Sequence, residues 1–150
     1  RFGNPDLAFE KVEEATKLAQ VYDDIKAMPE GFETIIGEKG VSLSGGQKQR
    51  LAMSRAMILD PDILILDDSL SAVDAEYAII DNLKHTRKDK TTIITAHRLS
   101  AVVHADLILV MQNGRIIERG RHEDLLAQGG WYAKTYESQQ LEMEGGEVDA

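Results

Sequence analysis

The sequence of 150 residues contains no cysteine. Disulfides, thiolate zinc sites, iron–sulfur clusters and cysteine nucleophiles are therefore excluded from it. It also has no apolar run near the roughly 20 residues that a membrane-spanning helix needs. The longest runs, Ile63–Leu66 and Leu107–Met111, have the length of strands. No segment has the pattern of a signal peptide. The sequence begins with Arg1 rather than Met, so we expect a piece of a longer protein.

Positive charge is also scarce. Lys and Arg number 17 against 26 Asp and Glu, so the formal net charge is −9 and the pI is about 4.9. A protein that coats nucleic acid carries a basic face, so this balance argues against a nucleic-acid partner. Nucleotide binding stays possible, because it needs only a few aimed amides and charges. Hydrophobic residues make up 43% of the chain, which is enough for a folded core in one domain.

Apolar residues at helical spacing dominate the first part of the chain. They predict a helix over 7–18 capped by Asp6, a short helix over 22–28, and a long helix over 44–59. We therefore expect a helical subdomain over about residues 1–60.

Beyond residue 60, short β-branched or apolar segments alternate with helical ones, which is typical of an α/β fold with a largely parallel sheet. The fully apolar segment Ile63–Leu66 is predicted to be a strand buried on both faces. Asn113-Gly114 indicates a hairpin turn. The acidic segment 141–150 is expected to be a disordered tail. Further strands are predicted at 91–95, 107–111 and 115–118, and helices at 77–87, 100–104, 122–127 and 131–138.

The sharpest local pattern is Leu43-Ser44-Gly45-Gly46-Gln47, at the start of the long helix. Five fixed residues arise by chance at roughly one in 10⁶ positions. Ser44 can cap the helix, while Gly45 and Gly46 leave backbone N–H groups uncovered at its N-terminus, an arrangement that binds phosphate. Taken alone, Ser-Gly-Gly favours the simpler interpretation of an ordinary capped helix after a glycine turn.

Acidic residues follow the strand predicted at 63–66, where Asp67 and Asp68 come next. Ligands of open α/β sheets bind at the carboxyl ends of the strands, and an Asp there can hold Mg²⁺. His97 follows the strand predicted at 91–95, so we expect it at the same edge. Each signal is weak alone, since an apolar strand can run into a surface turn and a lone histidine is more often structural.

In this order, the patterns resemble the ATP-binding cassette (ABC) family. The matching strings are LSGGQ at 43–47, ILILDD at 63–68, SAVD at 71–74 and TAHRLS at 95–100. The loop Gly37–Gly40 is similar to one that contacts the transmembrane domain in exporters of this family, and NGRIIERGRHEDLL at 113–126 is similar to exporter cassettes. The resemblance covers about 1–140. It implies a partial parallel sheet of the P-loop NTPase type, with the Walker B and switch region over about 61–140.

The resemblance also implies a role for each matching residue. Asp67 would order Mg²⁺, Asp74 would lie at the interface between two cassettes, and His97 would reach the γ-phosphate of ATP. The signature, which in the family contacts ATP bound to the opposite cassette, would consist of Ser44, Gly45, Gly46 and Gln47.

Three departures from the family pattern stand out. No G-x-x-x-x-G-K-[ST] occurs, so the phosphate-cradling loop is absent from these residues, and we expect the isolated chain not to hydrolyse ATP. Asp68 stands where the family usually has a catalytic Glu, as in the degenerate-site subunit of heterodimeric bacterial multidrug exporters. It is one methylene shorter, and a misplacement of about 1 Å can cost on the order of 10²-fold in rate. The stretch after Asp74 is also about two residues shorter than usual.

The resemblance therefore implies part of an ABC exporter's nucleotide-binding domain, which uses ATP and Mg²⁺ to power export from the cytoplasmic face of the cell membrane. Its partners would be a second nucleotide-binding domain, in a heterodimer, and a transmembrane domain reached through the Gly37–Gly40 loop. A soluble ABC-type ATPase of DNA maintenance is an alternative, disfavoured because the chain is acidic and no heptad run interrupts 44–67. A catalytically inactive interaction domain is another, supported by the missing phosphate loop.

Overall fold

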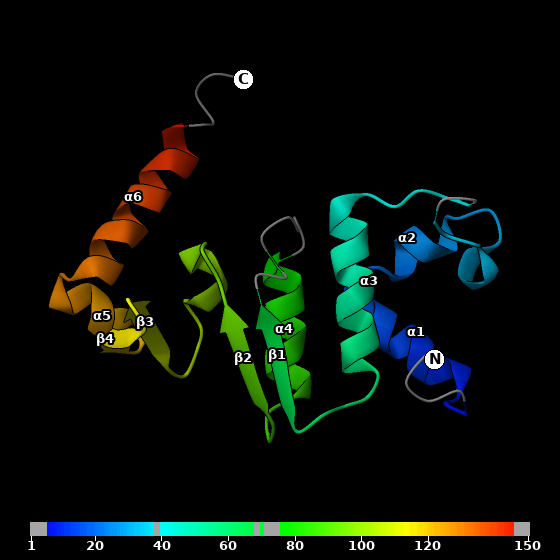
Figure 1. Ribbon diagram of the computed structural model, residues 1–150, viewed down its shortest axis with the longest axis horizontal. Helices are drawn as coiled ribbons and strands as arrows, with labels where there is room; N and C mark the ends of the chain where they lie inside the picture. Colours follow the sequence, from blue (N-terminus) through cyan, green and yellow to red (C-terminus); the bar gives the residue numbers. More distant parts are fainter. Residues whose placement is uncertain (1–5, 38–39, 68–69, 71–75, 146–150) are drawn as a thin grey trace. The chain divides into compact units, whose positions relative to one another are not determined.

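The computed structural model describes residues 6–37, 40–67, 70 and 76–145 (Figure 1). The chain divides into two compact units, Arg1–Thr95 and Ala96–Ala150. No helix in the described ranges combines the length and the apolar character that crossing a membrane requires.

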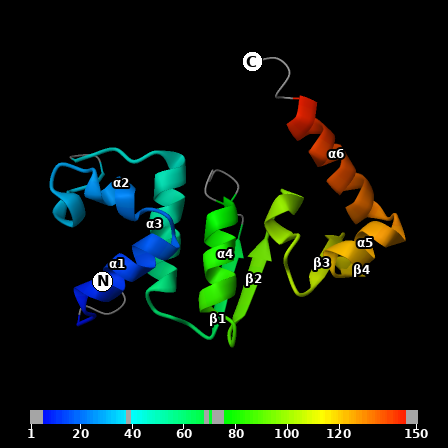
Figure 2. The same ribbon diagram turned by 180° about the vertical axis from the view of Figure 1, so that it is seen from behind.

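The first unit places a group of helices before a small parallel sheet. Both views show α4 alongside the two strands that it connects (Figure 1 and Figure 2). The mixed α/β architecture confirms the predicted fold class. The elements, in chain order, are α1 (Phe9–Leu18), α2 (Tyr22–Lys26), the 3₁₀ helix η1 (Gly31–Glu33), α3 (Gly45–Met57), β1 (Ile63–Asp67), α4 (Glu76–Thr86) and β2 (Thr91–Thr95).

Strands β1 and β2 pair in parallel, with Ile63 opposite Thr91 at one end and Asp67 opposite Thr95 at the other. This pairing of the two predicted strands agrees with the expected parallel sheet. Because both strands run the same way, their carboxyl ends meet at one edge of the sheet. That edge carries Asp67.

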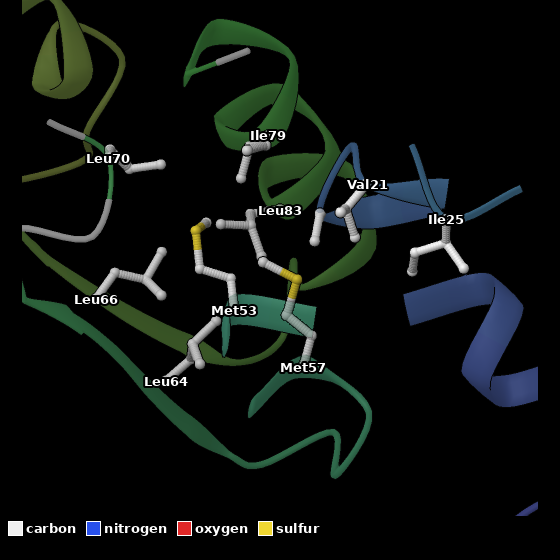
Figure 3. Packing of buried hydrophobic residues seen from close by; sticks show 10 residues of the cluster. Val21, Ile25, Met53, Met57, Leu64, Leu66, Leu70, Ile79 and Leu83 are labelled. Carbon is white, nitrogen blue, oxygen red and sulfur yellow. The ribbon is translucent and has the colours of Figure 1, made fainter. Parts of the chain in front are cut away.

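The core of this unit joins α3, α4 and β1. Met53 of α3, Ile79 and Leu83 of α4, and Leu64 and Leu66 of β1 all belong to one buried cluster (Figure 3). Alternate β1 residues point to opposite faces of the sheet, so both leucines lie on the same face. The helices α3 and α4 therefore cover that face.

The other face of β1 is open within the first unit, so the prediction of a strand buried on both faces is wrong. Leu64 and Leu66 are 3% and 2% exposed, whereas Ile63 and Ile65 are 60% and 61% exposed. On β2, Ile93 is 46% exposed. Within the described residues of this unit, the sheet has two strands, and the helices contribute to the core on the leucine face.

We expect Leu66→Ala and Ile65→Ala to affect stability very differently, although the two residues are neighbours. Leu66 is buried in the core, so its truncation should lower the free energy of unfolding by about 2–5 kcal/mol. Ile65 already faces solvent, so its truncation should cost less than about 1 kcal/mol. Urea unfolding of the two variants measures the difference, and equal losses would contradict the one-sided burial of β1.

The first helix begins later than predicted. Its N-cap residue is Ala8, with no side-chain capping bond, so the predicted cap at Asp6 is wrong. An N-cap side chain bonds the amides two or three residues ahead of it. Asp6 stands too early to do this for a helix that begins at Phe9. The second helix, α2, also ends at Lys26, two residues before the predicted end.

The described part of the second unit contains a hairpin, one 3₁₀ helix and two α-helices. The hairpin turns at Asn113 and Gly114, whose φ angles of 49° and 73° suit a tight two-residue turn and confirm the predicted hairpin. Its core contains Leu125 and Tyr132, both fully buried. The elements are η2 (Leu99–Val102), β3 (Ile108–Gln112), β4 (Arg115–Gly120), α5 (His122–Gln128) and α6 (Trp131–Gly145).

The helix α6 continues to Gly145, which corrects the expectation of a disordered tail from residue 141. Leu141, Glu142 and Met143 are good helix formers, which favours continuation of the helix over these positions. At its other end, the Glu118 carboxylate of β4 accepts hydrogen bonds from the backbone N–H groups of Trp131 (2.5 Å) and Tyr132 (3.0 Å). Residues 146–150 lie outside the described part of the chain.

Candidate functional site

The glycine-rich segment forms the predicted cap of α3. The Gln47 N–H donates to Ser44 Oγ (3.2 Å), and the Ser44 N–H donates to Gln47 Oε1 (3.0 Å), so the two residues form a capping box. The first amides of a helix, here those of Gly45 and Gly46, have no acceptor within the helix. Their N–H groups add to the positive end of the helix dipole, which favours an anion at this position.

Neither packing nor backbone conformation requires glycine at position 45. Gly45 is exposed, and a Cβ atom placed on it would meet nothing within 4 Å. Its φ angle is not in the left-handed region that favours glycine. A bare backbone here keeps the amides open to close approach from outside. Gly45 therefore serves neither packing nor a left-handed turn at this position.

A residue that no sequence pattern marked is bound to this cap. Asp24 of α2 accepts hydrogen bonds from Gln47 Nε2 (2.9 Å) and from Arg50 Nη2 (2.8 Å). Gln47 and Arg50 lie in the first two turns of α3. Asp24 and Gln47 are 23 positions apart in the sequence, so no local spacing pattern could predict this hydrogen bond.

Among the described residues, the carboxyl edge of the parallel sheet presents one carboxylate. Asp67 ends β1 and is exposed, and Thr95, opposite it at the end of β2, donates from Oγ1 to Asp67 Oδ1 (2.5 Å). Mg²⁺ is often held by one or two carboxylates together with substrate phosphates, so this donor set fits that ion. Thr95 was missed as a site residue, although the parallel register places it beside Asp67.

The other residues predicted at this edge lie outside the described residues or in the second unit. Asp68 and Asp74 lie outside the described residues. His97 belongs to the second unit, where it is exposed. There, Gln139 of α6 donates from Nε2 to the His97 carbonyl (2.9 Å) and accepts from the Leu99 N–H (2.9 Å). This amide holds the segment that follows β2 against α6, a contact no sequence pattern indicated.

The loop Gly37–Gly40 is described at its two ends only. Gly37 has a φ of +122°, which favours glycine. A Cβ atom on Gly40 would overlap the Ile35 carbonyl oxygen, which in turn accepts a hydrogen bond from the Val41 N–H (2.9 Å). The two glycines therefore permit a tight loop, closed by a bridge between Ile36 and Val41.

Comparisons with known proteins agree with this architecture. Residues 3–71 match the family model described as ABC transporter. The chain is 57% identical over 142 residues to a probable multidrug resistance ABC transporter ATP-binding/permease protein of Bacillus subtilis, covering 93% of this chain and 24% of that protein. It is 49% identical over 142 residues to the multidrug resistance-like ATP-binding protein MdlA of Escherichia coli, with the same coverage of 93% and 24%.

A solved structure is also similar. The structure of a bacterial Atm1-family ABC exporter with ATP bound has a TM-score of 0.83 and 38% identity, over 92% of this chain and 24% of that one. The fold is therefore that of an ABC exporter nucleotide-binding domain. Residues 3–71 therefore carry an ABC transporter domain, and the chain spans about a quarter of the length of these relatives.

Proposed function

We propose that this chain is the carboxyl-terminal part of an ABC exporter's nucleotide-binding domain, and that its signature, Ser44–Gln47, binds the γ-phosphate of ATP held by a second such domain. The observation that carries this proposal is the N-terminus of α3. It combines a capping box with an exposed glycine that neither packing nor backbone requires. The free amides and the helix dipole favour an anionic group approaching from outside.

At the sheet edge, Asp67 is proposed to hold Mg²⁺, and Thr95 to orient its carboxylate through the 2.5 Å hydrogen bond. The ion, when bound, neutralises charge on the phosphates of ATP. Asp68 is proposed to position the attacking water poorly, His97 to contact the γ-phosphate, and Asp74 to lie between the two domains. The names of the relatives support ATP as the nucleotide.

Two partners follow from this assignment. Because Asp68 replaces the longer carboxylate, we propose a heterodimer in which the second nucleotide-binding domain carries out most hydrolysis. The loop Gly37–Gly40 is proposed to contact a transmembrane domain, which would place the chain at the cytoplasmic face of the membrane. ATP hydrolysis would then power export of a substrate. The chain alone is proposed to be inactive, since its 150 residues contain no phosphate-cradling loop.

The metal assignment predicts the behaviour of Asp67→Asn in the whole exporter. With ATP and Mn²⁺ as a paramagnetic substitute for Mg²⁺, the variant should retain one fewer tightly bound Mn²⁺ per heterodimer than the unchanged protein, because a neutral amide is a weaker ligand for a hard cation. Electron paramagnetic resonance counts the bound ions. The control is Asp62→Asn, which makes the same change on an exposed residue at the opposite end of β1. Equal ion counts in the two variants would overturn the assignment.

A further inference from the structure

The contact between α2 and the cap of α3 fixes the orientation of the Gln47 side chain. An ionised carboxylate only accepts hydrogen bonds, so the Gln47 group that faces Asp24 must be its NH₂. The Gln47 carbonyl oxygen is then directed to the Ser44 N–H, at 3.0 Å. Reversing the amide would break both hydrogen bonds at once. Asp24 therefore selects the orientation in which the capping box is complete.

The position of Asp24 is itself fixed by the core. Val21, the N-cap residue of α2, and Ile25, the residue after Asp24, are buried in the same cluster as Met53 and Met57 of α3. Burial of these apolar side chains holds the short helix against α3. The carboxylate is thus presented to Gln47 by a backbone that packs independently of the hydrogen bond.

Arg50 balances the charge of Asp24. Their ion pair, at 2.8 Å, leaves the Asp24 side chain 29% exposed and the Arg50 side chain 18% exposed. Arg50 Nε is buried and has no hydrogen-bond partner within the described structure, so Asp24 is a principal anchor of this guanidinium. An anion that approaches the N-terminus of α3 therefore meets a neutralised pair instead of a bare carboxylate, which lowers the electrostatic repulsion.

We propose that Asp24 is a positioning residue for the signature: it locks the Gln47 amide and thereby the capped N-terminus of α3 in the geometry that receives a phosphate. This inference rests on the proposed function, because it assumes that the signature binds nucleotide. Asp24 acts through Gln47 and does not itself touch the ligand.

The test uses Asp24→Asn in the whole exporter, with Asp23→Asn as the matched control. Asp23 is the preceding residue of the same helix and is exposed, so its variant makes the same change in charge away from Gln47. We expect Asp24→Asn to lower kcat for hydrolysis at the partner's site by roughly 10- to 100-fold, because small misplacements of binding groups are costly. Asp23→Asn should stay within about twofold of the unchanged protein, as surface changes usually do.

A second variant separates positioning from a general loss of stability. If Asp24 acts through Gln47, then Asp24→Asn should add little to the loss already caused by Gln47→Ala, whereas independent structural effects would add. Thermal unfolding of each variant provides the stability reference. If Asp24→Asn fails to fold, Gln47→Ala breaks the same hydrogen bond from the other side and must by itself reproduce the loss at the partner's site.

The outcomes distinguish this inference from the function on which it rests. If Gly46→Asp leaves hydrolysis at the partner's site intact, the proposed function fails. If Gly46→Asp abolishes that hydrolysis while Asp24→Asn behaves like Asp23→Asn, the role of Asp24 alone is overturned. Additive losses in the double variant would also overturn it.

Discussion

Gly46→Asp should reduce hydrolysis at the partner's site by on the order of 10²- to 10³-fold, comparable to the loss of an aimed donor from an active site. The new carboxylate would stand where the γ-phosphate is proposed to approach, so like charges repel and the bare backbone is covered. ATP bound to this chain's own cassette should persist. Hydrolysis, nucleotide binding by each cassette and nucleotide-driven dimerisation measure the three effects.

A folding defect is the competing explanation for such a loss. Gly46 lies in the first turn of α3, which packs into the core through Met57, with Leu51 against the cluster. Gly45→Ala is a useful control, because its Cβ has open space and should leave thermal stability unchanged. A Gly46→Asp protein that keeps its unfolding temperature and loses only dimerisation and partner hydrolysis supports the signature. One that unfolds, or that dimerises normally, counts against it.

Asp68→Glu should have the opposite effect to Gly46→Asp, because it should raise the rate of hydrolysis at this chain's own site. The longer side chain restores the reach of the usual catalytic carboxylate, and correcting a misplacement of about 1 Å is worth up to about 10²-fold. The measurement is single-site turnover with the partner's own catalytic base mutated. Asp68→Asn, which keeps the shorter length and removes the charge, is the matched control. No gain with Glu would mean that the site is degenerate for another reason, such as a poor signature in the partner.

Local patterns predicted much of this fold. The capped start of α3, the parallel pair β1 and β2, and the Asn113-Gly114 turn all depend on residues within a few positions of one another, where propensity and periodicity act. The identity of Asp67 as the residue at the sheet edge followed from the strand alone. These are the features that short-range physics specifies.

Other features depend on contacts that a linear pattern does not contain. The hydrogen bond from Gln47 to Asp24 joins residues 23 positions apart. The hydrogen bond from Gln139 to the His97 carbonyl joins residues 42 positions apart. The prediction that β1 is buried on both faces was wrong. An all-apolar strand indicates two covered faces, but the elements that pack around the strand decide how many faces are covered. The predicted cap at Asp6 was wrong because the helix begins two residues later than predicted, and propensity locates helix ends poorly.

The open face of the β1–β2 sheet has a thermodynamic consequence. Ile63, Ile65 and Ile93 leave roughly half of their side-chain surface in water, and complete burial of an isoleucine is worth about 1.5–3 kcal/mol. Removing this surface from solvent would lower the heat capacity of the system. Any step that covers this face should therefore show a negative heat-capacity change in calorimetry. The favourable free energy of that step should decrease on cooling, so the covering of this face should be least stable at low temperature.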